Sequence, residues 1–264
     1  MPQSAKDREL FNLETSSEFL NARLKVNKEY SRIQFKDWLF DRLNVKEGER
    51  ILDVGCGTGA QSIGFLKKVG VSGAVCSTDI CEESVEQLRS ATGGASNLET
   101  FVGDMVYLRK MLRDEFSTSD FTLAHSSYAL YYANNHLDVL YAMKDALADD
   151  GRLAVFCPHH PHGMVEFARK HSHIPPSVDL SLNFGTDVLE SFFRSNFWEV
   201  EVHYFQNELT IDKLDVFLNI YRATTYFDQA VEEVVAAAVE SEIESYGCIK
   251  FDKPGYLAIG SQRR

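Results

Sequence analysis

The sequence predicts an α/β fold in which helices cover both faces of a doubly wound, mostly parallel sheet. Apolar, β-branched segments alternate with segments of helical periodicity between residues 50 and 157, which is typical of parallel sheets. A glycine-rich turn separates the first strand of this series from its helix. No repeat, low-complexity run or linker divides the 264 residues, so one domain with insertions is the simplest organisation.

The alternating series follows an N-terminal region that is expected to be helical. Apolar side chains recur at helical spacing over 28–44, so 1–44 is predicted to form a helical flap before a main domain at 45–264. Strands are predicted at 50–54, 73–78, 98–102, 120–126 and 151–157. Helices are predicted between them at 60–69, 82–91, 105–116 and 136–148. Right-handed crossovers then give the doubly wound order.

Two insertions in the C-terminal part are predicted to cap the main domain. Residues 158–184 contain four prolines and five histidines, which predicts a long irregular loop. A helix near 186–195 and a strand at 197–206 follow it. A helical segment at about 212–246 then precedes a last strand at 255–261. The aromatic residues of this helical segment favour a core position, and such lids also supply apolar walls to pockets.

Composition and charge disfavour several classes of function. A formal net charge of −12 repels nucleic acids and anionic membranes. No segment is apolar over the ~20 residues that a membrane helix needs, and the N-terminus lacks a signal-peptide pattern, so a cytoplasmic protein is expected. The five cysteines include no CxxC pair, so they are expected to be reduced thiols and not zinc ligands. The sequence does not indicate an oligomeric state.

The turn DVGCGTG, residues 53–59, lies where the first predicted strand ends. Glycines permit a sharp turn and a close approach to a ligand, and the next helix points its N–H groups at that ligand. Asp79 and Asp104 end the next two strands, where carboxylates can accept ribose hydroxyls and an adenine amino group. Each aspartate could instead cap a helix, but three successive strand ends together favour a nucleotide site. The turn also fits the glycine fingerprint of NAD-binding folds.

With these residues, the chain resembles the class I S-adenosylmethionine-dependent methyltransferases. The resemblance rests on DVGCGTG, TDI after the second strand, GD before a helix, and LADDGRLAVF as a late turn and strand, and it covers roughly 45–160. It implies a Rossmann-like sheet of seven strands with the last one antiparallel, which suits the helix-free ending GYLAIGS. It also implies that S-adenosyl-L-methionine is the cofactor.

The resemblance further implies a role for each residue of the cofactor site. The glycines pass beside the methionine portion, and Asp53 holds the amino end through the loop or water. Asp79 binds the ribose, Asp104 with Met105 binds the adenine, and Ile80 packs on the adenine face. The expected cofactor-binding set is Asp53, Gly55, Cys56, Gly57, Gly59, Asp79, Ile80, Gly103, Asp104, Met105 and His125.

Polar and aromatic residues follow the fourth predicted strand, beside the switch point where open sheets bind ligands. The residues expected to line the methyl-transfer site there are His125, Ser126, Tyr128, Tyr131 and Tyr132. His125, Tyr128 and His159 are the candidate catalytic residues, because a protonated amine or a phenol needs a base. An acceptor that is already neutral needs none. A lone histidine is more often structural, and one or two of the tyrosines are expected to be core.

The pattern H-x-x-x-x-L-Y-Y, from His125 to Tyr132, resembles histamine N-methyltransferase and related small-amine enzymes. This narrower resemblance implies that Glu18 faces an amine. Lys253-Pro254 stands where those enzymes have a polar pair. Together with the acidic balance, the resemblance favours an amine nitrogen as the acceptor.

The histidine-rich segment 159–173 is interpreted as a cap, with His159 or His160 at the mouth of the site. No metal site is expected, because adjacent histidines separated by proline diverge and no acidic or cysteine ligand stands at a helical offset. A solvent-exposed loop without a role is an open alternative.

The expected activity is in-line methyl transfer to a small molecule, with catalysis mainly by positioning. Proximity and orientation supply ~7–11 kcal/mol of a barrier without a dedicated catalytic side chain. Two alternatives stay open, namely an NAD-dependent oxidoreductase and a non-catalytic protein that binds S-adenosylmethionine.

Overall fold

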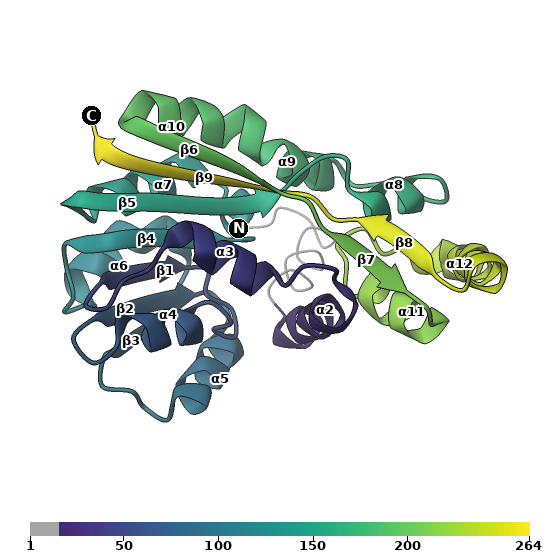
Figure 1. Ribbon diagram of the computed structural model, residues 1–264, viewed down its shortest axis with the longest axis horizontal. Helices are drawn as coiled ribbons and strands as arrows, with labels where there is room; N and C mark the ends of the chain where they lie inside the picture. The colour runs from purple at the N-terminus through teal and green to yellow at the C-terminus, as the bar shows by residue number, and fades with distance from the viewer. Residues whose placement is uncertain (1–15) are drawn as a thin grey trace.

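The computed structural model describes residues 16–264 and contains a seven-stranded sheet with helices on both faces (Figure 1). Its strands are β1 (Arg50–Val54), β2 (Ala74–Asp79), β3 (Leu98–Val102), β4 (Phe121–Ser127), β5 (Leu147–Pro158), β6 (Phe197–Phe205) and β9 (Gly255–Arg263). Their order is β3-β2-β1-β4-β5-β9-β6. Within this sheet β9 runs in the direction opposite to the other six strands. The predicted doubly wound, mostly parallel sheet is confirmed.

Helices cover both faces of this sheet through two apolar clusters. The helices are α3 (Phe35–Leu43), α4 (Ser62–Val69), α5 (Glu82–Thr92), α6 (Leu108–Asp114), α7 (His136–Asp145) and α10 (Glu190–Asn196). On one face, α3 and α4 bury Leu39 and Phe65 against β1, β4 and β5. On the other face, α6, α7 and α10 bury Met143 and Phe193. Burial on both faces explains why the central strands read as nearly continuous apolar runs.

A second, two-stranded sheet extends beyond the carboxyl end of β5. Its strands are β7 (Glu208–Ile211) and β8 (Ile249–Asp252), which pair antiparallel. They continue the β6–β9 ribbon, because Phe205 at the end of β6 pairs with Gly255 at the start of β9, and Glu208 of β7 pairs with Asp252 of β8. Around them lie α2 (Ser17–Tyr30), α8 (Gly163–Arg169), α9 (Pro176–Phe184), α11 (Leu214–Arg222) and α12 (Glu232–Tyr246), which share a separate apolar core. This extension therefore lies next to the carboxyl edge of the main sheet (Figure 1).

Three sequence-based element predictions differ in part from the structure. The predicted helix 28–44 is interrupted after Tyr30, where Ser31 pairs with Leu209 and the Ile33 amide donates to Asn207 Oδ1 (2.9 Å). The predicted irregular segment 158–184 contains α8 and α9. Pro176 is tolerated at the first turn of α9.

The third difference concerns the predicted helical segment 212–246, most of which forms α11 and α12, and its flanks. A break at residues 223–228 separates α11 from the single 3₁₀ turn that leads into α12. Strands β7 and β8 on either side were not predicted. Residues 1–15 of the predicted N-terminal flap lie outside the described residues. Among residues 16–264, no helix is both long enough and apolar enough to cross a membrane.

Candidate functional site

The glycine turn after β1 is held against β2 by backbone hydrogen bonds. The amides of Gly55 and Cys56 both donate to the Thr78 carbonyl (2.8 and 3.0 Å). Gly55, Gly57 and Gly59 have φ values of +74°, +51° and +84°, a left-handed conformation that glycine adopts without strain. Because strand order reverses between β1 and β4, this turn lies at the switch point of the sheet.

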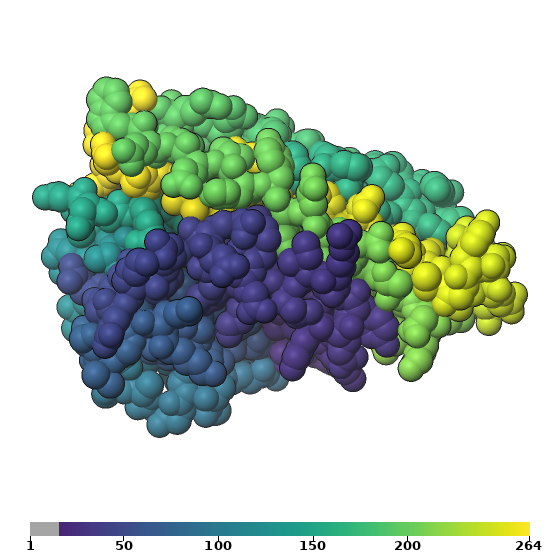
Figure 2. Space-filling model, in the orientation of Figure 1, coloured from purple at the N-terminus to yellow at the C-terminus, as the bar shows by residue number. Residues whose placement is uncertain are grey.

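Two of these glycines allow close packing with neighbouring segments. A β-carbon at position 55 would lie 2.3 Å from the β-carbon of Ala129, just after β4. A β-carbon at position 57 would lie 2.7 Å from Leu20 of α2. The turn is therefore bordered by the end of β4 and by α2. Figure 2 shows the N-terminal helices in purple on the face of the molecule that is in view.

Asp79 ends β2 and lies against the glycine turn. Its two carboxylate oxygens accept hydrogen bonds from the Gly57 amide (2.7 Å) and the Cys81 amide (2.9 Å). Burial raises the pKa of Asp79, and the backbone N–H donors partly oppose that rise. A carboxylate has about four acceptor positions, so Asp79 retains capacity for further donors such as paired hydroxyls.

The residues after β3 form a short turn beside the same edge. Asp104 accepts from the Val106 amide (3.0 Å), so it caps the turn that follows it. The Gly103 amide donates to the Asp79 carbonyl (2.9 Å), which links the ends of β2 and β3. A β-carbon at position 55 would lie 3.8 Å from Met105 Cε. Ile80, directly after Asp79, is partly buried.

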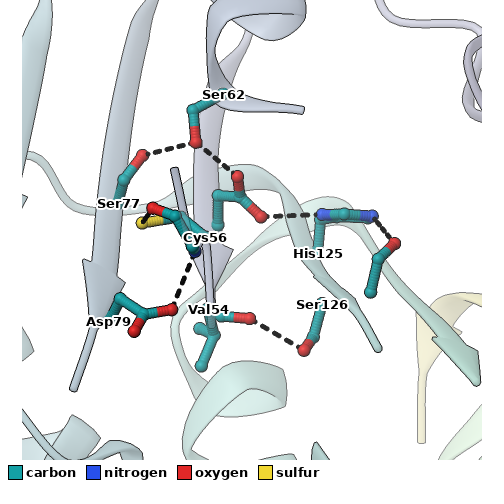
Figure 3. Close-up of polar contacts among 10 residues, drawn as sticks. Val54, Cys56, Ser62, Ser77, Asp79, His125 and Ser126 are labelled. Atoms are coloured by element: carbon teal, nitrogen blue, oxygen red, sulfur yellow. Dashed lines mark hydrogen bonds and ion pairs between the residues drawn. The ribbon is translucent and has the colours of Figure 1, made fainter. Parts of the chain in front are cut away.

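Asp53 and His125 lie inside the sheet as a buried hydrogen-bonded pair (Figure 3). Both are almost fully buried, with exposed fractions of 1% and 0%. His125 Nδ1 lies 2.8 Å from Asp53 Oδ1, and its Nε2 lies 2.7 Å from Ser127 Oγ. Ser62 Oγ donates to Asp53 Oδ2 (2.5 Å) and accepts from Ser77 (3.0 Å).

This placement favours a structural role for His125 over the predicted contact with a substrate or cofactor. Both ring nitrogens have protein partners, and the ring packs edge-on against Phe65 of α4. Asp53 is likewise buried, and each of its oxygens has a protein partner, Ser62 or His125. The pair therefore holds β1, β4 and α4 together below the glycine turn.

We expect His125→Phe to lower the free energy of unfolding by about 3 kcal/mol, because removal of one partner leaves a buried charge poorly compensated. Urea unfolding measures this loss. Ser126→Ala is the matched control, since Ser126 lies on the same strand and donates one neutral hydrogen bond to the Val54 carbonyl (2.8 Å). It should cost about 1 kcal/mol. Equal losses in the two variants would contradict the role of the Asp53–His125 pair.

Tyr128 stands at the end of β4 in a left-handed conformation, with φ of +57°. Such a backbone is unfavourable for tyrosine and is concentrated at functional sites. Its ring packs edge-on against Phe35 and Phe156, and burial raises its pKa. Tyr131 is partly buried against the core on the other face, whereas Tyr132 is 41% exposed. Ser126 is fully buried.

His159 packs between Tyr204 of β6 and Tyr256 of β9. Tyr128, by contrast, packs on Phe156 and the cluster beneath α3. The structure thus does not bring together the three residues expected to be catalytic. Glu18, expected to face an amine, is exposed on α2.

Three polar residues that the sequence did not single out as site residues lie close to one another, and one of them, Lys253, reaches the ring of Tyr128. Lys253 Nζ lies 6.0 Å from the Tyr128 ring centroid and donates to Asn27 Oδ1 (2.5 Å). Arg23 on α2 donates to the Ala223 carbonyl (2.8 Å). Burial, and then the charge of Lys253, lower the pKa of His162 to about 3. The sequence signals for them were the Lys253-Pro254 pair and the histidine-rich segment that contains His162.

Other features of the described residues lie away from this edge. Two surface hollows, of about 630 and 570 Å³, are formed mainly by α8 and α9 and by α8, α12 and β8. Neither includes a residue expected to bind the cofactor. Within residues 16–264, no cluster of three or more histidine, cysteine or acidic side chains is arranged to hold a metal ion.

Comparison with known proteins finds methyltransferases that are similar to the part of the chain that forms the carboxyl edge of the sheet. Residues 51–151, which include the glycine turn, Asp79 and Asp104, match the family model described as a methyltransferase domain. Aklanonic acid methyltransferase DauC of Streptomyces sp. strain C5 is 31% identical over 113 residues, which is 42% of this chain and 49% of that protein. The demethylmenaquinone methyltransferase of Staphylococcus saprophyticus is 27% identical over 49% of this chain and 54% of that protein. The chain spans about half the length of these curated relatives.

A solved structure extends the likeness of fold to most of the chain. The crystal structure of a putative methyltransferase from Bacillus halodurans superposes with a TM-score of 0.60, covering 88% of this chain and 100% of that one. Sequence identity is 16%. At this identity the likeness concerns the fold, including its mostly parallel sheet.

Proposed function

This chain contains a class I methyltransferase domain, and on that premise we propose that it transfers a methyl group from S-adenosylmethionine to a small-molecule acceptor. The observation that carries the proposal is the position of Asp79. Its carboxylate ends β2 and faces the glycine turn that follows β1. The antiparallel β9 at the end of the chain further favours this proposal over a nicotinamide dehydrogenase, whose second half continues with parallel strands.

The residues at the carboxyl edge fit the cofactor. S-adenosylmethionine supplies a methyl group already activated on a sulfonium sulfur. Gly55, Gly57 and Gly59 let the turn pack tightly against Ala129, Leu20 and Leu88, and the backbone of this tight turn would lie beside the methionine portion of the cofactor. Asp79 would accept the ribose hydroxyls. Asp104 and Met105 would contact the adenine, with Ile80 on its face and Cys56 and Gly103 supporting the two turns.

The work of the protein residues is then to position the acceptor and exclude water. Leu20 of α2 covers the turn at Gly57, so α2 shields the methionine side from solvent. Tyr128 lies beside Ala129, which packs on Gly55. Orientation of this kind contributes on the order of 7–11 kcal/mol to a barrier, so no dedicated catalytic base is required.

The three candidate catalytic residues receive different roles in this proposal. Tyr128 borders the acceptor side, where its raised pKa keeps the phenol protonated and able to donate a hydrogen bond. His125 acts as a positioning residue through Asp53 and Ser127. His159 supports the β6–β9 ribbon through Tyr204 and Tyr256.

Calorimetric titration with S-adenosylmethionine, S-adenosylhomocysteine and NAD tests the proposal. We expect both sulfur nucleotides to bind with micromolar affinity and NAD not to bind, because only the first two match the methyltransferase site. Binding also stabilises the folded state, so Tm should rise with either sulfur nucleotide. Binding of NAD alone, or of none of the three, would overturn the proposal.

A further inference from the structure

Two basic side chains at the carboxyl edge have no acidic partner among residues 16–264. The Arg23 guanidinium donates to a backbone carbonyl, and Lys253 Nζ donates to the side-chain oxygen of Asn27. Both side chains are partly buried. The chain has 39 acidic and 27 basic residues, so acidic partners are abundant. Other basic side chains, such as Arg50 and Lys144, also bind only neutral oxygens. Arg23 and Lys253 differ in being two partly buried basic groups close enough for the charge of Arg23 to act on Lys253.

These cations are linked to the glycine turn through Leu20 on one side and through Tyr128 on the other. Arg23 lies one helical turn after Leu20, the residue that packs against Gly57. Lys253 lies in the link between β8 and β9 and reaches the ring of Tyr128, whose neighbour Ala129 packs against Gly55. The β7–β8 extension thus brings Lys253 to the same edge as α2. We call Arg23 and Lys253, with Tyr128, Tyr131, His162 and Tyr226 around them, the cation cluster.

The rest of the cation cluster is aromatic or electrically neutral. Tyr226 is buried, and the Arg23 charge acts on both Tyr131 and Tyr226. His162 Nδ1 is buried with no hydrogen-bond partner among the described residues. Burial, and then the charge of Arg23, lower the pKa of Lys253 to about 7. A buried charge without a counter-ion is unfavourable, so the cluster is completed by a group that brings negative charge.

We propose that the methyl acceptor carries an anionic oxygen group, such as a carboxylate, on an aromatic body, and that Arg23 and Lys253 bind that group. This inference rests on the proposed methyltransferase function and names its acceptor class. It replaces the expectation of an amine acceptor that faces Glu18, because Glu18 is exposed while two cations line the site. A protonated amine would be repelled by them. The tyrosines offer flat, apolar walls to the body of the acceptor.

Three ligands of nearly equal shape test the charge preference: benzoate, benzamide and benzylamine. Each is titrated calorimetrically into protein saturated with S-adenosylhomocysteine. We expect benzoate to bind roughly tenfold or more tightly than benzamide, since a charge-assisted hydrogen bond is worth about that factor in affinity. Benzylamine should bind most weakly.

Variants then show which side chains cause the preference for benzoate. Lys253→Met should remove most of the benzoate advantage and leave benzamide binding unchanged, while Lys253→Arg should retain the advantage. Arg23→Met should independently reduce the advantage of benzoate over benzamide. Lys250→Met is the matched control, because Lys250 lies three residues away, is exposed and pairs with Glu208. This control should bind benzoate like the unmodified protein.

The outcomes separate this inference from the proposed function. Failure of S-adenosylhomocysteine to bind would overturn the proposed function, and the same three titrations on protein without nucleotide would still test the cation cluster. Normal nucleotide binding with benzylamine equal to or tighter than benzoate would overturn only the acceptor class. So would equal behaviour of Lys253→Met and Lys250→Met, or no binding of any of the three ligands.

Discussion

Asp79→Ala is expected to weaken binding of S-adenosylmethionine about 100-fold or more, since hydrogen bonds to a charged group contribute about 1.5–3 kcal/mol each. The carboxylate already aligns the Gly57 and Cys81 amides and would accept two ribose hydroxyls in addition. Alanine removes both functions, so the glycine turn loses its anchor as well as its acceptor. Calorimetry with S-adenosylmethionine measures the change.

A charge-matched control separates this effect from a general loss of negative charge. Glu83 follows Asp79 closely, is exposed in the first turn of α5 and makes no contact with the glycine turn in the hydrogen bonds of residues 16–264. Glu83→Gln should therefore bind the cofactor normally. If Glu83→Gln and Asp79→Ala weakened binding equally, Asp79 would not be the ribose acceptor.

The raised pKa of Asp79 also predicts how acid affects the site. Burial raises the pKa of Asp79 in the folded protein above the unfolded value near 3.8, so the folded state binds the proton more tightly. The stability gained from protonated Asp79 is therefore fully present below the unfolded pKa and is lost as pH rises through the folded pKa. The ionised carboxylate is thus held at a cost that cofactor hydroxyls would offset. Affinity for S-adenosylmethionine should fall on acidification at a higher pH than an ordinary aspartate would give.

The cofactor side of the site was accessible to sequence reasoning because its signals are local. The glycine turn, Asp79 and Asp104 each follow a strand of a regular series, and parallel strands bring their carboxyl ends to one edge. Val54 at the end of β1 pairs with Thr78 of β2, and Asp79 is the next residue along β2. This register brings Asp79 level with the glycine turn that follows Val54. Asp79 and the glycine turn indeed meet there.

The acceptor side could not be predicted in the same way because its contacts join remote segments. Asn27 and Lys253 are 226 residues apart in the chain. The contact between Asn27 and Lys253 depends on β7 and β8. Each of these strands has only four residues and flanks a helical segment, so its alternating pattern is too short to predict a strand. The sequence also cannot distinguish a histidine at a strand end from one inside the sheet, and His125 was placed at the acceptor for that reason. Its pairing with Asp53 follows from the register of β1 with β4.

Gly55→Ala is expected to lower the free energy of unfolding by about 3 kcal/mol, the sum of a left-handed alanine and overpacking against a fixed neighbour. The added carbon would meet the Ala129 β-carbon at 2.3 Å. Ala129 cannot swing away, because a β-carbon moves only with its backbone, and the adjacent Tyr128 amide is hydrogen-bonded to Phe156 (3.0 Å). The end of β4 must therefore shift, which would also displace Tyr128 and weaken S-adenosylhomocysteine binding.

Gly247→Ala is the control that separates the effect of the contact with Ala129 from the effect of a left-handed backbone. Gly247 ends α12 with φ of +76°, almost the same as the +74° of Gly55, and a β-carbon there would meet nothing within 4 Å. It should cost only the conformational term of about 1 kcal/mol and leave nucleotide affinity unchanged. Urea unfolding and calorimetry of the two variants give the comparison. If their stabilities fell equally and both bound S-adenosylhomocysteine normally, the contact between the glycine turn and the end of β4 would have no role in forming the cofactor site.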